Sequence, residues 1–401
     1  MGKTGVLTSY TMRLNSQSLN VPVSVALLSI ALAFSWQYAV VYTTFQGNWT
    51  ALFCAGDHYS RPLEIQHREY VFKGSAGYDG QFYQLIAHDP IFKHHYDGFI
   101  DAPRLRYRRI LMPGLAYLVA AGQAAMIDPA YIGVSWFFIG LGTFCLSQLA
   151  VDAGRQAFCG LLFLITPATL VAIERMTVDI SLTALCLACL LAARRQRWLL
   201  LWFTLAGAML SKETGVLAII AVVVWLAKQR RFRLAVALSS SLLPAVAWYQ
   251  FVQNHTSGDY NMSGFGLVSP FFVALTLPLD SGILPLVFRV ATIAAVAGLL
   301  WAAIRSIVLG VQNRFHDLET LLCALFAALL LLFQYTPIWG DPDGFTRIHS
   351  PLLVCLIAAT LRKGFGQTLA SFAMVACPLC LQLGEHLVWP ALRSFGHTNW
   401  Y

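Results

Sequence analysis

The chain has 401 residues, of which 58% are hydrophobic and 11% are charged, and its formal net charge is +8. A soluble domain carries about 25% charged residues, so this composition excludes a water-soluble protein, and the 13% of aromatic residues exclude a disordered chain. A membrane protein with several apolar spans remains, and its positive charge fits basic cytoplasmic loops better than nucleic-acid binding.

The first apolar segment, residues 21–42, is too long for the core of a signal peptide, so it is predicted to be a membrane span. The one long polar stretch, residues 43–110, follows it. The later apolar segments lie at 111–127, 131–150, 157–173, 177–193, 198–210, 215–227, 234–252, 265–279, 283–304, 319–336, 348–361 and 368–389. The sequence shows no repeat or linker. It predicts a single transmembrane domain over residues 1–401, an all-α polytopic bundle with a large first extracytoplasmic loop at 43–110.

Basic residues in the short loops predict the orientation, because cytoplasmic loops are enriched in Lys and Arg. Placing these clusters inside, with the amino terminus, requires that segments 111–127 and 265–279 do not fully cross, which leaves about eleven spans. The hairpin 198–227 is short for two full spans, so its tip, Ser211–Thr214, is predicted to lie within the protein. The inner clusters are Arg155; Arg194, Arg195 and Arg197; Lys228, Arg230, Arg231 and Arg233; Arg305 and Arg314; and Arg362 and Lys363.

Nearly all the unusual polar residues fall on the predicted outer side. An ionisable group at membrane depth is costly and indicates a functional site, so this grouping predicts an extracytoplasmic site above a helical bundle. The groups are the loop 43–110, the stretch from Glu174 to Asp179, Lys212 with Glu213, the stretch from His255 to Tyr260, and the stretch from Asp341 to Arg347.

The densest stretch of the outer loop is Tyr78-Asp79-Gly80-Gln81-Phe82-Tyr83. Asp79 before Gly80 fits a helix cap or turn. The aromatic residues on both sides favour instead a sugar-binding or membrane-interface site, with water excluded from the carboxylate. Four arginines, at positions 104, 106, 108 and 109, precede the apolar run at Ile110. They either anchor the loop among lipid headgroups or bind a specific phosphate.

Several of these motifs resemble a bacterial family of membrane proteins associated with cell-surface glycopolymer formation. More broadly, they are similar to the glycosyltransferase C superfamily, which includes GPI-anchor mannosyltransferases, protein O-mannosyltransferases and the aminoarabinose transferases of lipid A. The resemblance rests on Tyr78 to Tyr83, Ala87 to Pro90, Asp101 to Pro103, Tyr107 to Pro113, Glu174-Arg175 with Asp179, Leu210 to Thr214, and Arg347 to Pro351.

The resemblance implies an inverting transferase of the bacterial cytoplasmic membrane that uses a polyprenyl-phosphate sugar and a glycan or lipid acceptor. It also implies a catalytic base in the first external loop, and the matching residue is Asp79. Many members carry a second acid beside the first, which Asp79-Gly80-Gln81 lacks, so the use of a divalent metal stays open. We expect substrate or phosphate contacts from Tyr78, Gln81, Tyr83, Arg106, Arg108, Arg109, Lys212 and Arg347, and support from the acids Asp89, Asp101, Glu174, Asp179 and Glu213.

Other functions stay open. A surface-polysaccharide polymerase or ligase also has a large external loop. A transporter of lipid-linked glycans would show repeated halves and charged groups near mid-membrane, which the sequence lacks, and a scaffold without activity is the last alternative. Eight of the nine cysteines lie in apolar segments, so we expect no disulfide framework.

Overall fold

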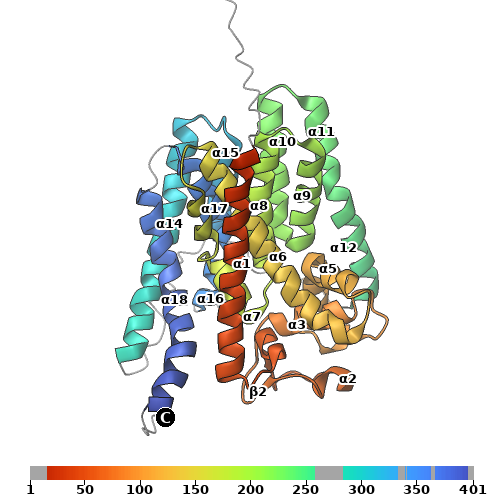
Figure 1. Ribbon diagram of the computed structural model, residues 1–401. Helices are drawn as coiled ribbons and strands as arrows, with labels where there is room; N and C mark the ends of the chain where they lie inside the picture. The colour runs from red at the N-terminus through yellow and green to blue at the C-terminus, as the bar shows by residue number, and fades with distance from the viewer. Residues whose placement is uncertain (1–15, 258–282, 333–338, 340, 363–365, 396–401) are drawn as a thin grey trace, which may run out of the picture.

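The computed structural model describes residues 16–257, 283–332, 339, 341–362 and 366–395, and within these ranges the chain is mostly helical and has almost no sheet (Figure 1). Two short strands, β1 (Ala55–Gly56) and β2 (Val71–Phe72), pair in parallel, with Ala55 opposite Val71. The predicted all-α class is therefore confirmed for the described part of the chain.

Four helical stretches are long and apolar enough to cross a membrane: Asn20–Thr44, Ala124–Asp152, Phe232–His255 and Arg289–Gln312. They belong to α1 (Ser16–Thr44), α6 (Ala124–Asp152), α11 (Phe232–Ser239) with η5 (Ser240–Leu242) and α12 (Leu243–His255), and α14 (Ile283–Gln312). A bent pair, η3 (Ala157–Phe163) and α7 (Pro167–Arg175), would make a fifth span with a bend of 57°. Length and composition thus give four or five candidate spans among the described residues, and the predicted eleven are not confirmed.

Most of the remaining apolar segments form shorter helices, α8 (Asp179–Arg194), α9 (Trp198–Ser211), α10 (Val216–Lys228), α15 (Leu318–Leu332) and α17 (Ser350–Thr360). The last helix, α18 (Gly366–Phe395), is long, with 30 residues. Between α9 and α10 the chain turns through η4 (Glu213–Gly215), and Ser211 and Lys212 at this tip are only 0% and 7% exposed. The prediction that the tip lies within the protein is therefore confirmed for Ser211 and Lys212, whereas Glu213 and Thr214 are half-buried.

The segment 111–127 does not form one spanning helix. Its first part is α5 (Leu111–Val119), which has nine residues and is about 13 Å long at 1.5 Å per residue. The chain then reverses at Ala121 and Gly122, both with positive φ, before α6 begins. This agrees with the prediction that the segment stays on one side. The second such segment, 265–279, lies outside the described residues.

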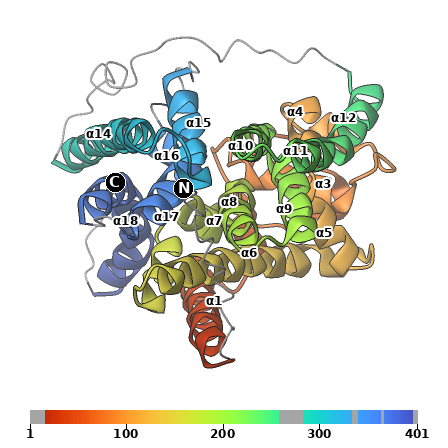
Figure 2. The same cartoon turned by 90° about the horizontal axis from the view of Figure 1, so that it is seen from above.

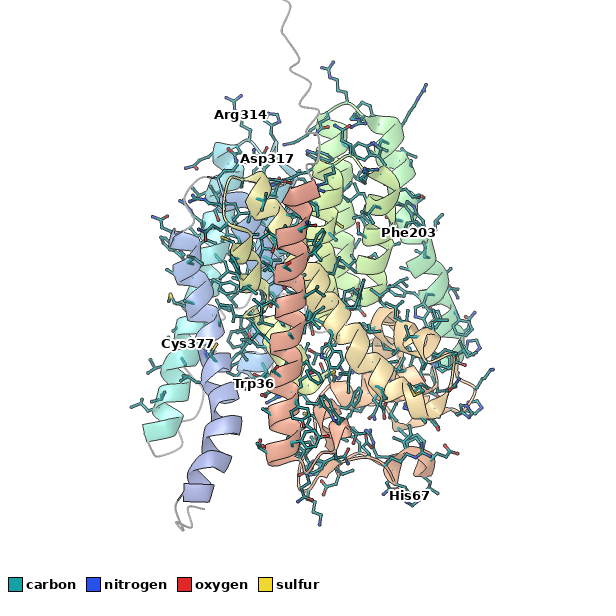
Figure 3. The ribbon with its side chains drawn as sticks, viewed as in Figure 1. Trp36, His67, Phe203, Arg314, Asp317 and Cys377 are labelled. Carbon is teal, nitrogen blue, oxygen red and sulfur yellow. The ribbon has the colours of Figure 1, made fainter. Side chains whose placement is uncertain are left out.

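The bundle is organised around α6. Figure 2 shows α6 crossing the molecule, with α1 packed on its outer side and α8 on its inner side, and α14 runs along α18 elsewhere in the bundle. The outward faces carry exposed apolar side chains, such as Leu199 (72%) and Val236 (71%), and Phe203 points outward in Figure 3. Large exposed apolar surface indicates contact with lipid or partners, which fits a helical bundle in a membrane.

The two ends of the bundle differ. A polar lobe at one end contains η1 (Trp49–Phe53), α2 (Leu63–Gln66), α3 (Gly80–His88), η2 (Tyr96–Phe99) and α4 (Pro103–Arg108). Figure 3 shows His67 of this lobe at the end opposite Arg314 and Asp317.

The loops that were predicted to be cytoplasmic meet one another at the end opposite the lobe. Arg194 pairs with Glu319, and Arg195 lies 3.8 Å from Asp152. The Lys228 ammonium donates a hydrogen bond of 2.9 Å to the carbonyl oxygen of Arg314. These loops, which were predicted to share one face, therefore lie together, while the side of the membrane that they occupy stays a prediction.

Candidate functional site

Asp79 occupies the N-cap position of α3, but its side chain makes no capping hydrogen bond. A cap function therefore does not account for this carboxylate. The following Gly80 lies against the end of α7, and a Cβ atom there would be 2.2 Å from the carbonyl oxygen of Arg175. Only glycine permits this approach, which brings Asp79 close to α7 and α8.

Asp79 is the centre of a run of alternating charges contributed by segments far apart in sequence. One carboxylate oxygen lies 2.8 Å from Arg106 of α4, and the other pairs with Arg347 of α16 (Pro342–Ile348). Arg106 also donates to Asp101, over 3.0 and 2.8 Å. We call the full set the ion-pair chain; in order, it comprises Asp101, Arg106, Asp79, Arg347, Asp179 and Lys212.

The inner half of the ion-pair chain lies deeper in the bundle. Arg347 reaches Asp179, the first residue of α8, over 3.4 Å, and Asp179 also pairs with Lys212 at the tip after α9. The side chains of Asp179, Lys212 and Arg347 are 5%, 8% and 8% exposed, whereas that of Asp79 is 19% exposed. Asp79 is thus more accessible than the charges on its inner side.

Arg106 and Arg347 keep the carboxyl group of Asp79 ionised. Burial alone would raise the pKa of this carboxyl, but the charges and hydrogen bonds of Arg106 and Arg347 hold the pKa well below its usual range. Burial likewise disfavours the charged guanidinium of Arg347, and the neighbouring Asp79 more than offsets this, so the pKa of Arg347 is raised. Asp79 is therefore ionised at neutral pH, and it accepts protons weakly while both arginines hold it.

A second ion pair flanks the ion-pair chain. The Nε atom of Arg109 lies 3.2 Å from Glu213, and its Nη1 donates to the hydroxyl of Tyr83 over 3.0 Å. The guanidinium of Arg106 lies 5.7 Å from the centre of the same Tyr83 ring, a distance typical of a cation–π contact. Tyr83, Arg109 and Glu213 thus lie beside Asp79, as the sequence predicted.

Tyr78 joins the site to α16. Its hydroxyl donates to Asp341 over 3.0 Å, and the guanidinium carbons of Arg175 and Arg347 lie 4.5 and 4.9 Å from its ring centre. Arg175 in turn pairs with Asp343, at 2.5 Å. Sequence reasoning did not predict this Arg175–Asp343 pair, because no local pattern relates α7 to α16.

Two predicted residues of the outer loop lie elsewhere. Gln81 is fully buried and donates to the carbonyl oxygen of Ala76 over 2.8 Å. Asp89 is 1% exposed, and its carboxylate accepts hydrogen bonds from the backbone N–H groups of Lys93, His94 and Tyr96. Both side chains therefore hold the fold of the loop, and the expectation that they join Asp79 at one site is not met.

Two further residues that were predicted to join the site, Glu174 and Arg108, also lie outside the ion-pair chain. Glu174 accepts a hydrogen bond of 3.2 Å from the indole of Trp36 and, with Tyr78, lines a separate cavity of about 350 Å³. The guanidinium carbon of Arg108 lies 5.3 Å from the ring centre of Tyr249. Arg108 is thus turned toward α12, away from Arg106.

The described residues offer no group of three His, Cys, Asp or Glu side chains that could hold a metal ion. Asp79 and Asp179 each face cations instead, with Arg347 between them. All nine cysteines are free, as expected from the sequence.

Sequence reasoning also missed a polar pair on the other side of α3. The Nε2 atom of His88 lies 3.0 Å from Asp128 at the start of α6, and Gln84 donates to the same carboxylate oxygen over 3.2 Å. The spacing of Gln81, Gln84 and His88 along one helical face was the available signal.

Comparison of this chain with protein-family models, with curated proteins and with solved structures gives no match.

Proposed function

We propose that this protein is a membrane glycosyltransferase that moves a sugar from a polyprenyl-phosphate donor to a hydroxyl group of a cell-envelope glycan or lipid. The observation that carries the proposal is the setting of Asp79, a half-buried carboxylate held between two arginines in a polar lobe at the end of an apolar bundle. The sequence resemblance to the glycosyltransferase C superfamily supports the same assignment of Asp79 as the base.

The finer topology belongs to the same proposal. The polar lobe lies on the extracytoplasmic face of a bacterial cytoplasmic membrane, and the amino terminus lies in the cytoplasm. The proposed total of about eleven spans includes short helices such as α9 and α10. They have 14 and 13 residues, whereas a full span requires about 20. Such short helices bury one face against other helices, as Leu201 and Leu205 of α9 show, and expose apolar side chains such as Leu199 outward.

The proposed reaction is a single displacement. The acceptor oxygen attacks the anomeric carbon, and the bond from that carbon to the phosphate oxygen breaks as the new glycosidic bond forms. The proton of the acceptor hydroxyl passes to Asp79. The electron pair leaves with the polyprenyl phosphate, which is stable as an anion and needs cations rather than an acid. Attack from the opposite side inverts the anomeric centre.

Arg106 and Arg347 supply those cations. Each has a second carboxylate partner, Asp101 or Asp179, so each can turn toward a phosphate and keep a counter-charge. Planar guanidinium groups bind phosphate oxygens in pairs. When the donor phosphate engages them, Asp79 loses the interactions that depress its pKa, and its burial then raises the pKa, which makes it a better base.

One observation favours a second candidate function. Asp179 and Lys212 form a buried pair among helix ends, and buried charges of this kind also occur in transporters. A transporter of lipid-linked glycans would move its lipid intact. A polymerase or ligase of surface polysaccharide would cleave a glycan from its lipid carrier but hand over a chain rather than one sugar.

The purified protein in lipid vesicles, supplied in separate reactions with polyprenyl-phosphate sugars or lipid-linked glycans and with a lipid extract as acceptor, separates these functions. A transferase releases polyprenyl phosphate and forms a product that is one sugar larger, and mass spectrometry detects both. Movement of intact donor across the bilayer, with no release of polyprenyl phosphate, would replace the proposal with the transporter. Transfer of a whole glycan would replace it with the polymerase or ligase.

A further inference from the structure

A second cavity, of about 540 Å³, lies between α1, the start of α6 and the outer lobe. Its walls include Gln84 and His88 of α3, whereas Asp79 precedes that helix at its other end. At 1.5 Å per residue, nine residues of helix separate Asp79 and His88 by about 13 Å. No small ligand group can contact both, so this cavity is distinct from the ion-pair chain.

One end of the cavity is polar and carries more carboxylates than cations. Asp128 is paired with His88 and Gln84, and the carboxylate of Glu64 accepts a hydrogen bond of 2.5 Å from Tyr96. Glu69 also lines this end, but it is neutralised by its buried partner Arg61. Arg68 is the one arginine or lysine among the lining residues, and it faces the two acids Asp128 and Glu64, so the polar end does not favour a phosphate.

The other end of the cavity is aromatic and reaches the membrane-spanning part of the bundle. The ring of Phe34 on α1 lies 5.4 Å from that of Trp136 on α6 and 6.1 Å from that of Trp49. Phe34 is 41% exposed and lies within the candidate span Asn20–Thr44. Pro129 and Ile132 line the wall between the two ends. The cavity thus runs from an apolar opening among membrane helices to a polar head.

We propose that this cavity binds a neutral glycolipid, with its apolar chain against Phe34 and Trp136 and its sugar at Asp128 and His88. Paired carboxylate, amide and imidazole groups accept and donate hydrogen bonds to hydroxyls, and the excess of acids disfavours an anionic headgroup. The volume falls within the range of about 300–1,000 Å³ typical of ligand sites. The inference goes beyond the proposed transfer reaction and does not depend on it.

Photolabelling tests the proposal directly. The probe is an alkyl glucoside with a diazirine in its chain, added to the purified protein in lipid nanodiscs, and mass spectrometry identifies the labelled residues. We expect saturable labelling around residues 34 and 124–136. Unlabelled alkyl glucoside should compete for it, whereas an alkyl phosphate or an alkyltrimethylammonium of the same chain length should compete at least tenfold less well.

A matched pair of variants controls the assignment. Ala125→Trp fills the cavity, because Ala125 lines it, whereas Met126→Trp places the same indole ring at an exposed neighbour outside the lining. The first should abolish saturable labelling and the second should not change it. Asp128→Asn should weaken competition by the glucoside several-fold, and it provides a separate test if Ala125→Trp does not fold.

Equal competition by the alkyl phosphate or the alkyltrimethylammonium would overturn the proposal, as would unchanged labelling of folded Ala125→Trp or of Asp128→Asn. Asp79→Asn should label like the wild type, because the cavity lies away from Asp79. A failure of glycosyl transfer would therefore leave the result on this cavity intact, and the two proposals can fail separately.

Discussion

Asp79 differs from an ordinary surface or capping aspartate in three respects. Its side chain does not cap α3, it pairs with two arginines, and it remains 19% exposed. The arginines are the groups that hold its pKa below the usual range against the effect of burial. A ligand that competes for Arg106 and Arg347 therefore also changes the basicity of Asp79.

Replacement of single arginines tests the phosphate contact. Arg106→Lys and Arg347→Lys should each lower the rate of transfer about 10- to 100-fold, because a lysine cannot reproduce a forked pair of charged hydrogen bonds, which contribute about 1.5–3 kcal/mol. Arg108→Lys is the matched control, since Arg108 faces Tyr249 instead. The measurement is the initial rate of polyprenyl phosphate release.

If Arg108→Lys impairs transfer as strongly as the other two variants, the effect comes from general anchoring of the loop. Full activity of both Arg106→Lys and Arg347→Lys would show that the two arginines serve only as counter-charges for Asp79.

The pH dependence tests whether the donor frees Asp79. In the protein without donor, the pKa of Asp79 lies below its usual range because Arg106 and Arg347 outweigh the effect of burial. Protonation of Asp79 should therefore not lower kcat/KM, which reports the free enzyme, between about pH 5 and 7. Once phosphate holds the arginines, the pKa rises, so kcat should fall as the pH is lowered toward 5.

The sign follows from the role of the base, because a protonated Asp79 cannot accept the acceptor proton. Steady-state rates across this pH range provide the measurement, and thermal melting at each pH verifies that the protein stays folded. An acid limb in kcat/KM with none in kcat would contradict the proposed exchange of partners.

The short helix α3 positions the site as a unit. Its start lies against the end of α7 at Gly80, where a Cβ atom would be 2.2 Å from one carbonyl oxygen, that of Arg175, and 3.0 Å from another, that of Phe53. The contact fixes both Tyr78, which meets α16, and Asp79. The opposite face of the helix lines the second cavity through Gln84 and His88.

Gly80→Ala should therefore displace α3 and impair the site. Forcing a methyl group into packed backbone costs about 1–3 kcal/mol or more, so the melting temperature should drop and transfer should fall at least tenfold. Gly98→Ala is the control, because a Cβ atom at Gly98 meets nothing within 4 Å. Thermal melting and transfer rates of both variants give the comparison, and a Gly80→Ala protein as stable and active as Gly98→Ala would contradict this account of α3.

The sequence could predict several residues of the ion-pair chain, but it could not predict which of them pair with one another. Acids and bases in loops between apolar segments predict a polar face, and this pattern singled out Asp79, Asp179, Lys212 and Arg347. It could not show that Arg347 lies between the two acids, because tertiary packing brings α16 to α3 and α8. The same limit explains why Asp128 was not linked to His88.

The arrangement of the helices agrees better with the prediction from the loop charges than with the prediction from the lengths of the apolar segments. Basic loops predicted to share one face do contact one another, as Arg194–Glu319 and Arg195–Asp152 show. Apolar length defines a span less well, because a helix buried among other helices, such as α8 (16 residues), can be shorter than one that faces lipid. A buried helix and a lipid-facing helix have similar apolar compositions, so composition alone does not distinguish them.

Cysteine labelling determines which face is extracytoplasmic. In a variant without the native cysteines, a cysteine at His67 of the polar lobe should react with an impermeant reagent in intact cells. Cysteines at positions 195 and 231 should react only after the membrane is broken, because their loops are rich in Arg and Lys. The reverse pattern would place the ion-pair chain in the cytoplasm, where the proposed extracytoplasmic reaction could not take place.

The most direct test of the central claim, that Asp79 is the base of a glycosyl transfer, compares Asp79→Asn with Asp97→Asn in the purified protein. Asp97 lies in the same lobe, in η2, outside the ion-pair chain. Each arginine partner of Asp79 keeps another acid, so the Asn protein should fold and bind the donor. Loss of a general base should slow the release of polyprenyl phosphate by about 10²–10⁴-fold, while Asp97→Asn stays near the wild-type rate. Donor binding together with release within twofold of wild type in Asp79→Asn would contradict the assignment.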